Sequence, residues 1–131
     1  MDGCMRDVVC ALIERPGGEV LACKRGPDTH LAGLWEFPGG KTEDGERDAQ
    51  ALQREIAEEL DVKIEVADAL QFVEWDYGTV AIRLRPYRCR IIEGEPRPKV
   101  HAEVRWCKAE DLGDLDWAPA DRPILREWLE L

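Results

Sequence analysis

The sequence predicts an α/β fold in which one mixed β-sheet is packed between helices. The expected elements follow one another as strands, helix, strands and helix, an order that favours a sheet covered by helices. The chain has 131 residues, which fits a single domain over residues 1–131. A hydrophobic content of 44% beside a charged content of 35% is typical of a globular protein.

Two strands and a long loop are expected in the first third of the chain. Short apolar runs over 8–13 and 20–24 flank the turn-forming residues 15–18, so they are predicted as a pair of strands. The glycines and prolines of residues 25–47 exclude a regular helix there and predict a loop. Loops of that length in compact domains are usually functional.

An amphipathic helix is predicted from about Asp48 to Leu60. Apolar residues recur at three- and four-residue spacing at Ala49, Leu52, Ile56 and Leu60, and acidic residues fill the opposite side.

Further strands and a closing helix are predicted in the second half. Strands are expected over 70–75, over the alternating segment 79–85, and over 104–108. The closing helix is expected to have Asp121 as its N-cap and Pro123 in its first turn.

Charge and hydropathy exclude several classes of protein. Lys and Arg number 18 against 28 Asp and Glu, a formal net charge of −10, whereas nonspecific binding to nucleic acid depends on clustered basic residues. No apolar stretch approaches the about 18 residues that a membrane span needs, and the N-terminus resembles no signal peptide. We therefore expect a cytoplasmic protein that binds neither a nucleic-acid polymer nor a membrane.

The cysteines are expected to be reduced. They are Cys4, Cys10, Cys23, Cys89 and Cys107, an odd number at wide spacing with no metal-binding pattern. Four fall in predicted strands, where a free cysteine packs as a small hydrophobic residue.

Three glutamates share one side of the predicted central helix. At 100° per residue, Glu55 and Glu59 face nearly the same way, and Glu58 lies about 60° to one side. One interpretation is a solvated face with Arg54 and Glu58 as an ion pair. The other is a site for divalent cations such as Mg²⁺, which prefer carboxylate oxygens and bridge them to phosphates.

The segment ahead of this helix favours the metal site. Pro38-Gly39-Gly40 allows the backbone to approach a ligand closely and can expose a carbonyl oxygen as a further ligand. Glu46 adds an acid near the start of the helix.

The segment from Gly40 to Val62 resembles the Nudix box, G-x5-E-x7-R-E-U-x-E-E-x-G-U, where U is aliphatic. Every specified position matches except the last glycine, which is Asp61 here. That glycine would supply a left-handed cap at the helix end. Asp tolerates this conformation better than most residues, so we expect a small cost in stability and no loss of activity.

Similarity continues outside the box to the MutT-like branch of the Nudix hydrolases, the nucleoside triphosphate pyrophosphohydrolases. The similar positions are Arg25, Asp28, His30, 31–32, 35–41 and 117–121. The resemblance implies a Nudix hydrolase domain over residues 1–131, folded as an α/β/α sandwich around a mixed sheet.

The resemblance also implies a catalytic metal site for Mg²⁺ or Mn²⁺. The implied metal ligands are Glu55, Glu58, Glu59 and the main-chain carbonyl of Gly39. Arg54 would orient the glutamates, and Glu46 would support the loop or pair with Arg54. Water would attack a phosphorus of the nucleotide to give a nucleoside monophosphate and pyrophosphate.

The general base and the substrate contacts are less determined. Glu103 is the nearest candidate for the base, with a solvated surface acid as the alternative, and an isolated residue such as His101 is usually structural or exposed. Arg25 resembles a substrate-contacting arginine, although a solvated position at a strand end is equally compatible, and Lys41 is a further expected contact.

Recognition of the base is expected to involve Phe37 and Asp121. Phe37 is similar to a base-contacting aromatic residue, and Trp35, Phe72, Trp75 and Trp117 offer other stacking surfaces, most of them expected in the core. An ionised Asp121 suits an exocyclic amine such as cytosine N4, and a protonated one suits a purine edge.

The first hypothesis is thus a metal-dependent pyrophosphohydrolase of nucleoside triphosphates, including oxidised or methylated ones. Its partner would be a small nucleotide, and the protein would be a monomer or homodimer. The alternatives are a hydrolase of another nucleoside diphosphate derivative and a nucleotide-binding module without catalysis.

Overall fold

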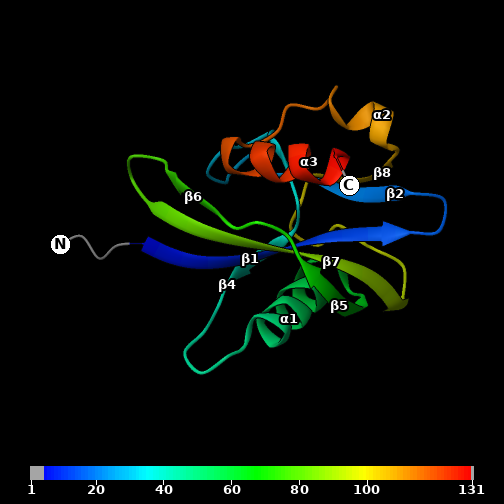
Figure 1. Cartoon of the computed structure of the whole chain (residues 1–131), viewed down its shortest axis with the longest axis horizontal. Helices are drawn as coiled ribbons and strands as arrows, with labels where there is room; N and C mark the ends of the chain where they lie inside the picture. The colour runs from blue at the N-terminus through cyan, green and yellow to red at the C-terminus, as the bar shows by residue number, and fades with distance from the viewer. Residues whose placement is uncertain (1–4, 131) are drawn as a thin grey trace.

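The computed structural model describes residues 5–130, and Cys4 among the predicted thiols lies outside them. An eight-stranded mixed sheet runs through the molecule, with helix α1 (Asp48–Leu60) on one face and helix α3 (Arg122–Leu129) on the other, as Figure 1 shows. The predicted α/β class with a mixed sheet between helices is confirmed.

Two long parallel strands form the centre of the sheet. They are β1 (Met5–Arg15) and β7 (Ala81–Glu93), which pair from Met5 beside Ala81 to Ile13 beside Cys89. On its other edge β7 pairs antiparallel with β5 (Lys63–Ala69) and β6 (Val73–Asp76).

The remaining strands extend the sheet on the β1 side. They are β2 (Glu19–Lys24), β3 (Trp35–Glu36), β4 (Gly39–Lys41) and β8 (Glu103–Cys107). Strand β2 pairs antiparallel with β1, β3 and β8, and β4 pairs with β1. The short helix α2 (Ala109–Leu112) and the 3₁₀ turn η1 (Pro119–Asp121) complete the chain before α3.

The two faces of the sheet carry separate cores because side chains alternate along a strand. In β1, Val9, Ala11 and Ile13 pack with the apolar side of α1, whereas Cys10 and Leu12 pack towards α3. Pairing along β1 therefore fixes which residues of the sheet face each helix.

Helix α1 has the predicted bounds. It begins where the Arg47 backbone N–H donates to Gln50 Oε1 at 3.0 Å. It ends at Asp61, whose φ of 60° and ψ of 38° are left-handed and whose N–H donates to the Ala57 carbonyl at 3.1 Å. Asp61 therefore takes the position of the expected glycine with the predicted backbone conformation.

Several predicted strand positions were wrong. The loop over 25–47 contains β3 and β4, which are too short to show periodicity. The strand expected over 70–75 begins only at Val73, and β5 was missed because its second half is largely exposed and gives little apolar signal. Strand β7 also continues beyond residue 85.

The predicted capping role of Asp121 was wrong as well. Asp121 precedes α3, but its φ of −83° and ψ of −17° are already helical and its side chain makes no capping bond. That side chain instead accepts a hydrogen bond from the Phe37 backbone N–H at 3.1 Å. The Asp121 carboxylate therefore bonds to a distant segment of the chain and does not cap α3, as its place in the sequence had suggested.

Two other expectations concern the cysteines and membranes. Cys10, Cys23, Cys89 and Cys107 are buried free thiols on strands, as predicted. No helix among residues 5–130 has the length and apolar character to span a membrane.

Candidate active site

Arg54 on α1 connects the helix to the loop before it. Its guanidinium donates to both carboxylate oxygens of Glu46, at 2.7 and 2.9 Å, and to the Lys41 carbonyl at 3.1 Å. The bonds from Arg54, followed by one from the Glu43 backbone N–H, lower the pKa of Glu46 to about 2. The same guanidinium donates to Glu55 at 2.8 Å and to Glu58 at 3.4 Å. Arg54 therefore sets the orientation of two of the predicted metal ligands.

Glu55 lies directly against the backbone of β4. A Cβ built on Gly40 would come within 2.3 Å of Glu55 Oε1, so residue 40 has no room for a side chain while Glu55 holds this position. On the preceding residue, a Cβ on Gly39 would come within 1.9 Å of the Val9 carbonyl oxygen on β1. The two glycines thus allow β4 to lie between the central strand and the glutamates of α1.

Glu59 is the most buried of the predicted metal ligands, with 14% of its side chain exposed. Its pKa is raised to about 9, first by burial, then by a hydrogen bond with Glu55 and by the charges of Glu36 and Glu55. Its Oε1 atom is buried and has no hydrogen-bond partner among residues 5–130.

Glu58 is the exposed member of the three glutamates. Its side chain is 61% exposed and forms an ion pair with Arg54 at 3.4 Å, the pair expected for a solvated face of the helix. Mutual repulsion and hydration favour leaving this third carboxylate in solvent. Within the described chain, no three His, Cys, Asp or Glu side chains are arranged as they stand to hold a metal ion.

The donor set nevertheless fits a hard divalent cation. Glu59 presents an unpartnered buried oxygen beside the carboxylate of Glu55, and the exposed Glu58 on the same side of the helix offers a third carboxylate. Oxygen ligands of this kind suit Mg²⁺ or Mn²⁺.

Glu36 and His101 were not assigned to the site from the sequence. Glu36 on β3 accepts from Arg25 Nη1 at 2.7 Å, and its other oxygen lies 2.9 Å from His101 Nε2. The His101 side chain is 4% exposed, and its Nε2 is 4.0 Å from Glu59 Oε1. One feature of the sequence could have indicated a functional role for Glu36: it is an acidic residue between two aromatic residues, Trp35 and Phe37, that are buried.

The loop between β7 and β8 brings His101 to this position. The backbone N–H groups of Arg97 and Lys99 donate to the carbonyls of Leu60 and Glu59 at 2.9 and 3.1 Å. These bonds satisfy carbonyls at the end of α1 that have no partner within the helix. The N–H of Ala102 then donates to the Lys24 carbonyl at 2.9 Å, so His101 is fixed between α1 and β2.

Glu103, the candidate general base, does not lie with the glutamates of α1. It pairs with Lys24 in the sheet, in a register that places its half-exposed side chain on the same face as Cys107, the face that α3 covers. There it forms an ion pair with Arg105 at 2.8 Å. The glutamates of α1 lie on the other face, and Glu103 lines neither of the cavities described below.

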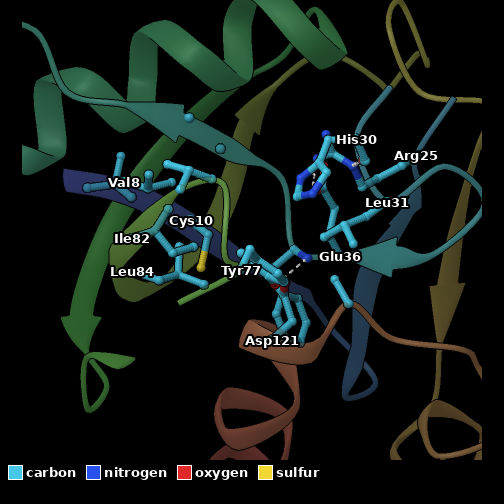
Figure 2. Close-up of a pocket in the computed structure, with 16 residues that line it drawn as sticks. Val8, Cys10, Arg25, His30, Leu31, Glu36, Tyr77, Ile82, Leu84 and Asp121 are labelled. Carbon is cyan, nitrogen blue, oxygen red and sulfur yellow. Dashed lines mark hydrogen bonds and ion pairs between the residues drawn. The ribbon is translucent and has the colours of Figure 1, made fainter. Parts of the chain in front are cut away.

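A cavity of about 190 Å³ opens beside β3 and β4 (Figure 2). Apolar side chains of β1 and β7, among them Val8 and Leu84, form one wall. Asp121 lies at the opposite end and is 6% exposed. Burial, followed by the charge of Glu36, raises the pKa of Asp121 well above its usual value.

The predicted substrate contacts divide into two groups. Arg25, Phe37 and Asp121 all line this cavity. The Phe37 ring also packs against Trp117 with a centroid distance of 4.7 Å. Lys41 is exposed and lines no cavity described here, and its carbonyl accepts from Arg54.

Only two of the four other aromatic residues that were considered as stacking surfaces lie in the core, fewer than expected. Trp35 and Trp117 are buried in the core on the α3 side, whereas Phe72 and Trp75 are partly exposed and lie outside the cavity. Tyr77, for which no role was predicted, does line it.

A second cavity, of about 210 Å³, adjoins the first and shares Arg25, Glu36 and Gly39 with it. Glu59 and His101 line this second space. The site therefore combines a largely apolar cavity that ends at a buried acid with a polar cavity that ends at the carboxylates of α1. This arrangement fits an elongated ligand with a planar end and a charged end.

Comparisons with known proteins agree with this arrangement. The family model described as the NUDIX domain matches residues 9–127. A Mycobacterium tuberculosis protein named "Putative 8-oxo-dGTP diphosphatase 2" is 44% identical over 119 residues, covering 88% of this chain and 82% of that protein. The CTP pyrophosphohydrolase of Escherichia coli K12 is 35% identical over 127 residues, covering 97% and 93%. The solution structure of the E. coli ORF135 protein superimposes with a TM-score of 0.84 at 34% identity, covering 97% of this chain and 90% of that one.

Proposed function

The chain belongs to the NUDIX domain family, and we propose that it hydrolyses ribo- or deoxyribonucleoside triphosphates, including oxidised or otherwise modified ones, to a nucleoside monophosphate and pyrophosphate. Relatives named as 8-oxo-dGTP diphosphatases and as a CTP pyrophosphohydrolase support this reaction. Such an activity would remove unwanted nucleotides from the cellular pool.

One observation carries the proposal. The polar cavity that contains the unpartnered Glu59 oxygen adjoins the cavity that ends at Asp121, and both share Arg25, Glu36 and Gly39. A nucleoside in the first cavity would therefore direct its phosphates towards the glutamates of α1.

We propose that Glu55, Glu58 and Glu59, together with the Gly39 carbonyl, hold Mg²⁺ or Mn²⁺. When bound, the cation polarises phosphoryl oxygens and lowers the pKa of the attacking water. It also allows a protein with a net charge of −10 to accept a polyanion. Metal binding requires the ligands to be ionised, so Glu59 would release its proton when the cation enters.

The surrounding residues would orient the reacting groups. Arg54 would hold Glu55 and Glu58 through its bonds to both, and Glu46 would keep Arg54 in place. Arg25 would contact the substrate where the two cavities meet, Asp121 and Phe37 would contact the base, and Lys41 would attract the phosphates from the exposed end of β4.

Pyrophosphate release tests the proposal directly. The purified protein would be incubated with Mg²⁺ and a panel containing 8-oxo-dGTP, CTP and 5-methyl-dCTP, and the phosphate products identified. We expect pyrophosphate and a nucleoside monophosphate from at least one substrate, and a fall in turnover of at least about 10-fold in Glu58→Gln. Glu110→Gln, on exposed α2, is the matched control and should leave turnover unchanged.

Two results would overturn the proposal. One is saturable nucleotide binding without any product across the panel, which would indicate a binding module. The other is full turnover in Glu58→Gln.

A further inference from the structure

We propose that Tyr77 is a specificity-determining residue, whose hydroxyl donates a hydrogen bond to a carbonyl oxygen on the base of the substrate. The substrates favoured would be those with an oxopurine edge, in which a ring carbonyl lies beside the N7 acceptor, as in guanine. This inference rests on the proposed function and specifies the substrate class of the same site.

Tyr77 is held at the wall of the nucleoside cavity by its own backbone. It follows β6 directly, and its N–H donates to the Val80 carbonyl at 2.8 Å, which closes the turn into β7. The side chain is partly buried and lines the cavity. Figure 2 shows it close to Asp121.

The hydrogen bonds of the Tyr77 hydroxyl leave its proton available. The oxygen accepts from the Ala120 backbone N–H at 3.0 Å. A phenol has a single proton, and no residue between 5 and 130 accepts it. Towards a ligand in the cavity, the hydroxyl is therefore primarily a donor.

Asp121 provides the second half of the recognition. One of its oxygens, Oδ1, accepts from the Phe37 backbone N–H, which leaves Oδ2 for a ligand. Because Tyr77 bonds to the residue just before Asp121, the hydroxyl and the carboxyl group are held in a fixed relation. Burial raises the pKa of Asp121 and favours its protonated form, so Oδ2 presents a proton beside that of Tyr77. Two neighbouring donors match O6 and N7 of guanine, which both accept hydrogen bonds.

The tyrosine ring also limits where the base can lie. It makes an edge-to-face contact with His30 on the opposite loop, with a centroid distance of 5.4 Å. Both residues line the cavity, so their contact fixes the ring of Tyr77 at its wall. A base that lacks the carbonyl would leave the Tyr77 proton without an acceptor, and unpaired groups of this kind give strong discrimination.

The test combines a substitution at Tyr77 with removal of the carbonyl group from the base of the substrate. We would measure kcat/KM with Mg²⁺ for dGTP and for 2-aminopurine deoxyriboside triphosphate, which lacks the 6-oxo group, in the wild-type protein and in Tyr77→Phe. We expect the wild type to prefer dGTP by about 10-fold and the variant to lose most of this preference.

Tyr87→Phe is the matched control, because Tyr87 is the other tyrosine and its hydroxyl donates to Asp48 at 2.6 Å, outside the cavity. It should keep the wild-type ratio. Tyr77→Phe also loses the bond to Ala120, which should lower kcat/KM for the two substrates equally. Only the ratio of the two kcat/KM values therefore reports contact with the base.

The outcomes separate the two proposals. An equal preference for the two substrates in the wild type, or an unchanged ratio in Tyr77→Phe, would overturn the role of Tyr77 while hydrolysis itself stands. Absence of hydrolysis of every triphosphate by the wild type would overturn the proposed function itself.

Discussion

The carboxylate of Glu55 packs against Gly40 so closely that a Cβ at residue 40 would lie 2.3 Å from Glu55 Oε1. Glu55 comes from α1 and Gly40 from β4, so this contact joins the helix that carries the acids to the strand that borders both cavities. Arg54 holds Glu55 from the other side at 2.8 Å. Glu55 is therefore fixed by its surroundings before any ligand binds.

Gly40→Ala should displace Glu55 and lower Mg²⁺-dependent turnover by at least about 10-fold, because the new methyl group occupies the space of the carboxylate. Steady-state assays over a range of Mg²⁺ concentrations would measure the loss. Gly113→Ala is the control, since a Cβ there meets nothing within 4 Å and its φ of −67° suits alanine. Wild-type turnover in Gly40→Ala would contradict a need for Glu55 in this position.

Glu59→Gln should stabilise the metal-free protein increasingly as the pH rises. The pKa of Glu59 is about 9 in the folded protein and about 4.5 as the ordinary value, so between these pH values the unfolded chain has released a proton that the folded chain retains. Stability of the wild type therefore falls across this window, whereas glutamine has no proton to lose.

Thermal unfolding in the presence of a chelator, from pH 5 to pH 9, would measure the difference. The Tm of Glu59→Gln should gain several degrees over that of the wild type towards pH 9. The same variant should lose Mg²⁺-dependent turnover. Parallel Tm profiles for the two proteins would show that the Glu59 pKa is not raised.

His101→Ala should destabilise the protein by about 1–3 kcal/mol, because Glu36 loses a buried hydrogen-bond partner beside Glu59. Urea unfolding would measure this loss, and kcat should fall with it since Glu36 borders both cavities. His101→Gln retains a donor and should recover part of both quantities. Equal behaviour of the two variants would mean that bulk at residue 101, rather than the hydrogen bond, is what matters.

Asp61→Gly should raise the free energy of unfolding by about 0.5–1 kcal/mol without changing kcat/KM. The residue has φ of 60°, a conformation that glycine adopts without steric cost. Urea denaturation would show the gain, and the free energy of unfolding of Asp61→Ala should fall below that of the wild type. A loss of stability in the glycine variant would mean that the Asp61 side chain compensates for its backbone.

The candidate site could be predicted from the segment that forms α1, where the information is local. The spacing of Glu55, Glu58 and Glu59 and the position of Arg54 belong to one continuous segment, and the same segment carries the family resemblance. The sequence left open whether Glu58 faces a metal ion or pairs with Arg54 in solvent, because side-chain positions of like charges depend on solvation and on neighbouring groups. Glu103 was the nearest candidate for the general base, with a solvated surface acid as the alternative, and the register of β8 with β2 puts it on the face of the sheet away from α1.

The sequence by itself determined the α/β class, both ends of α1, the pairing of the first two strands and the line of acids along the helix. Each depends on periodicity, turn residues or backbone preferences within a few neighbouring positions. Tertiary structure alone decided that Asp121 bonds to Phe37, 84 residues away, that Tyr77 borders the nucleoside cavity, and that Glu36 lies between Arg25 and His101. The reason is that pairing between distant strands and competition for buried hydrogen bonds are settled only when the whole sheet has assembled.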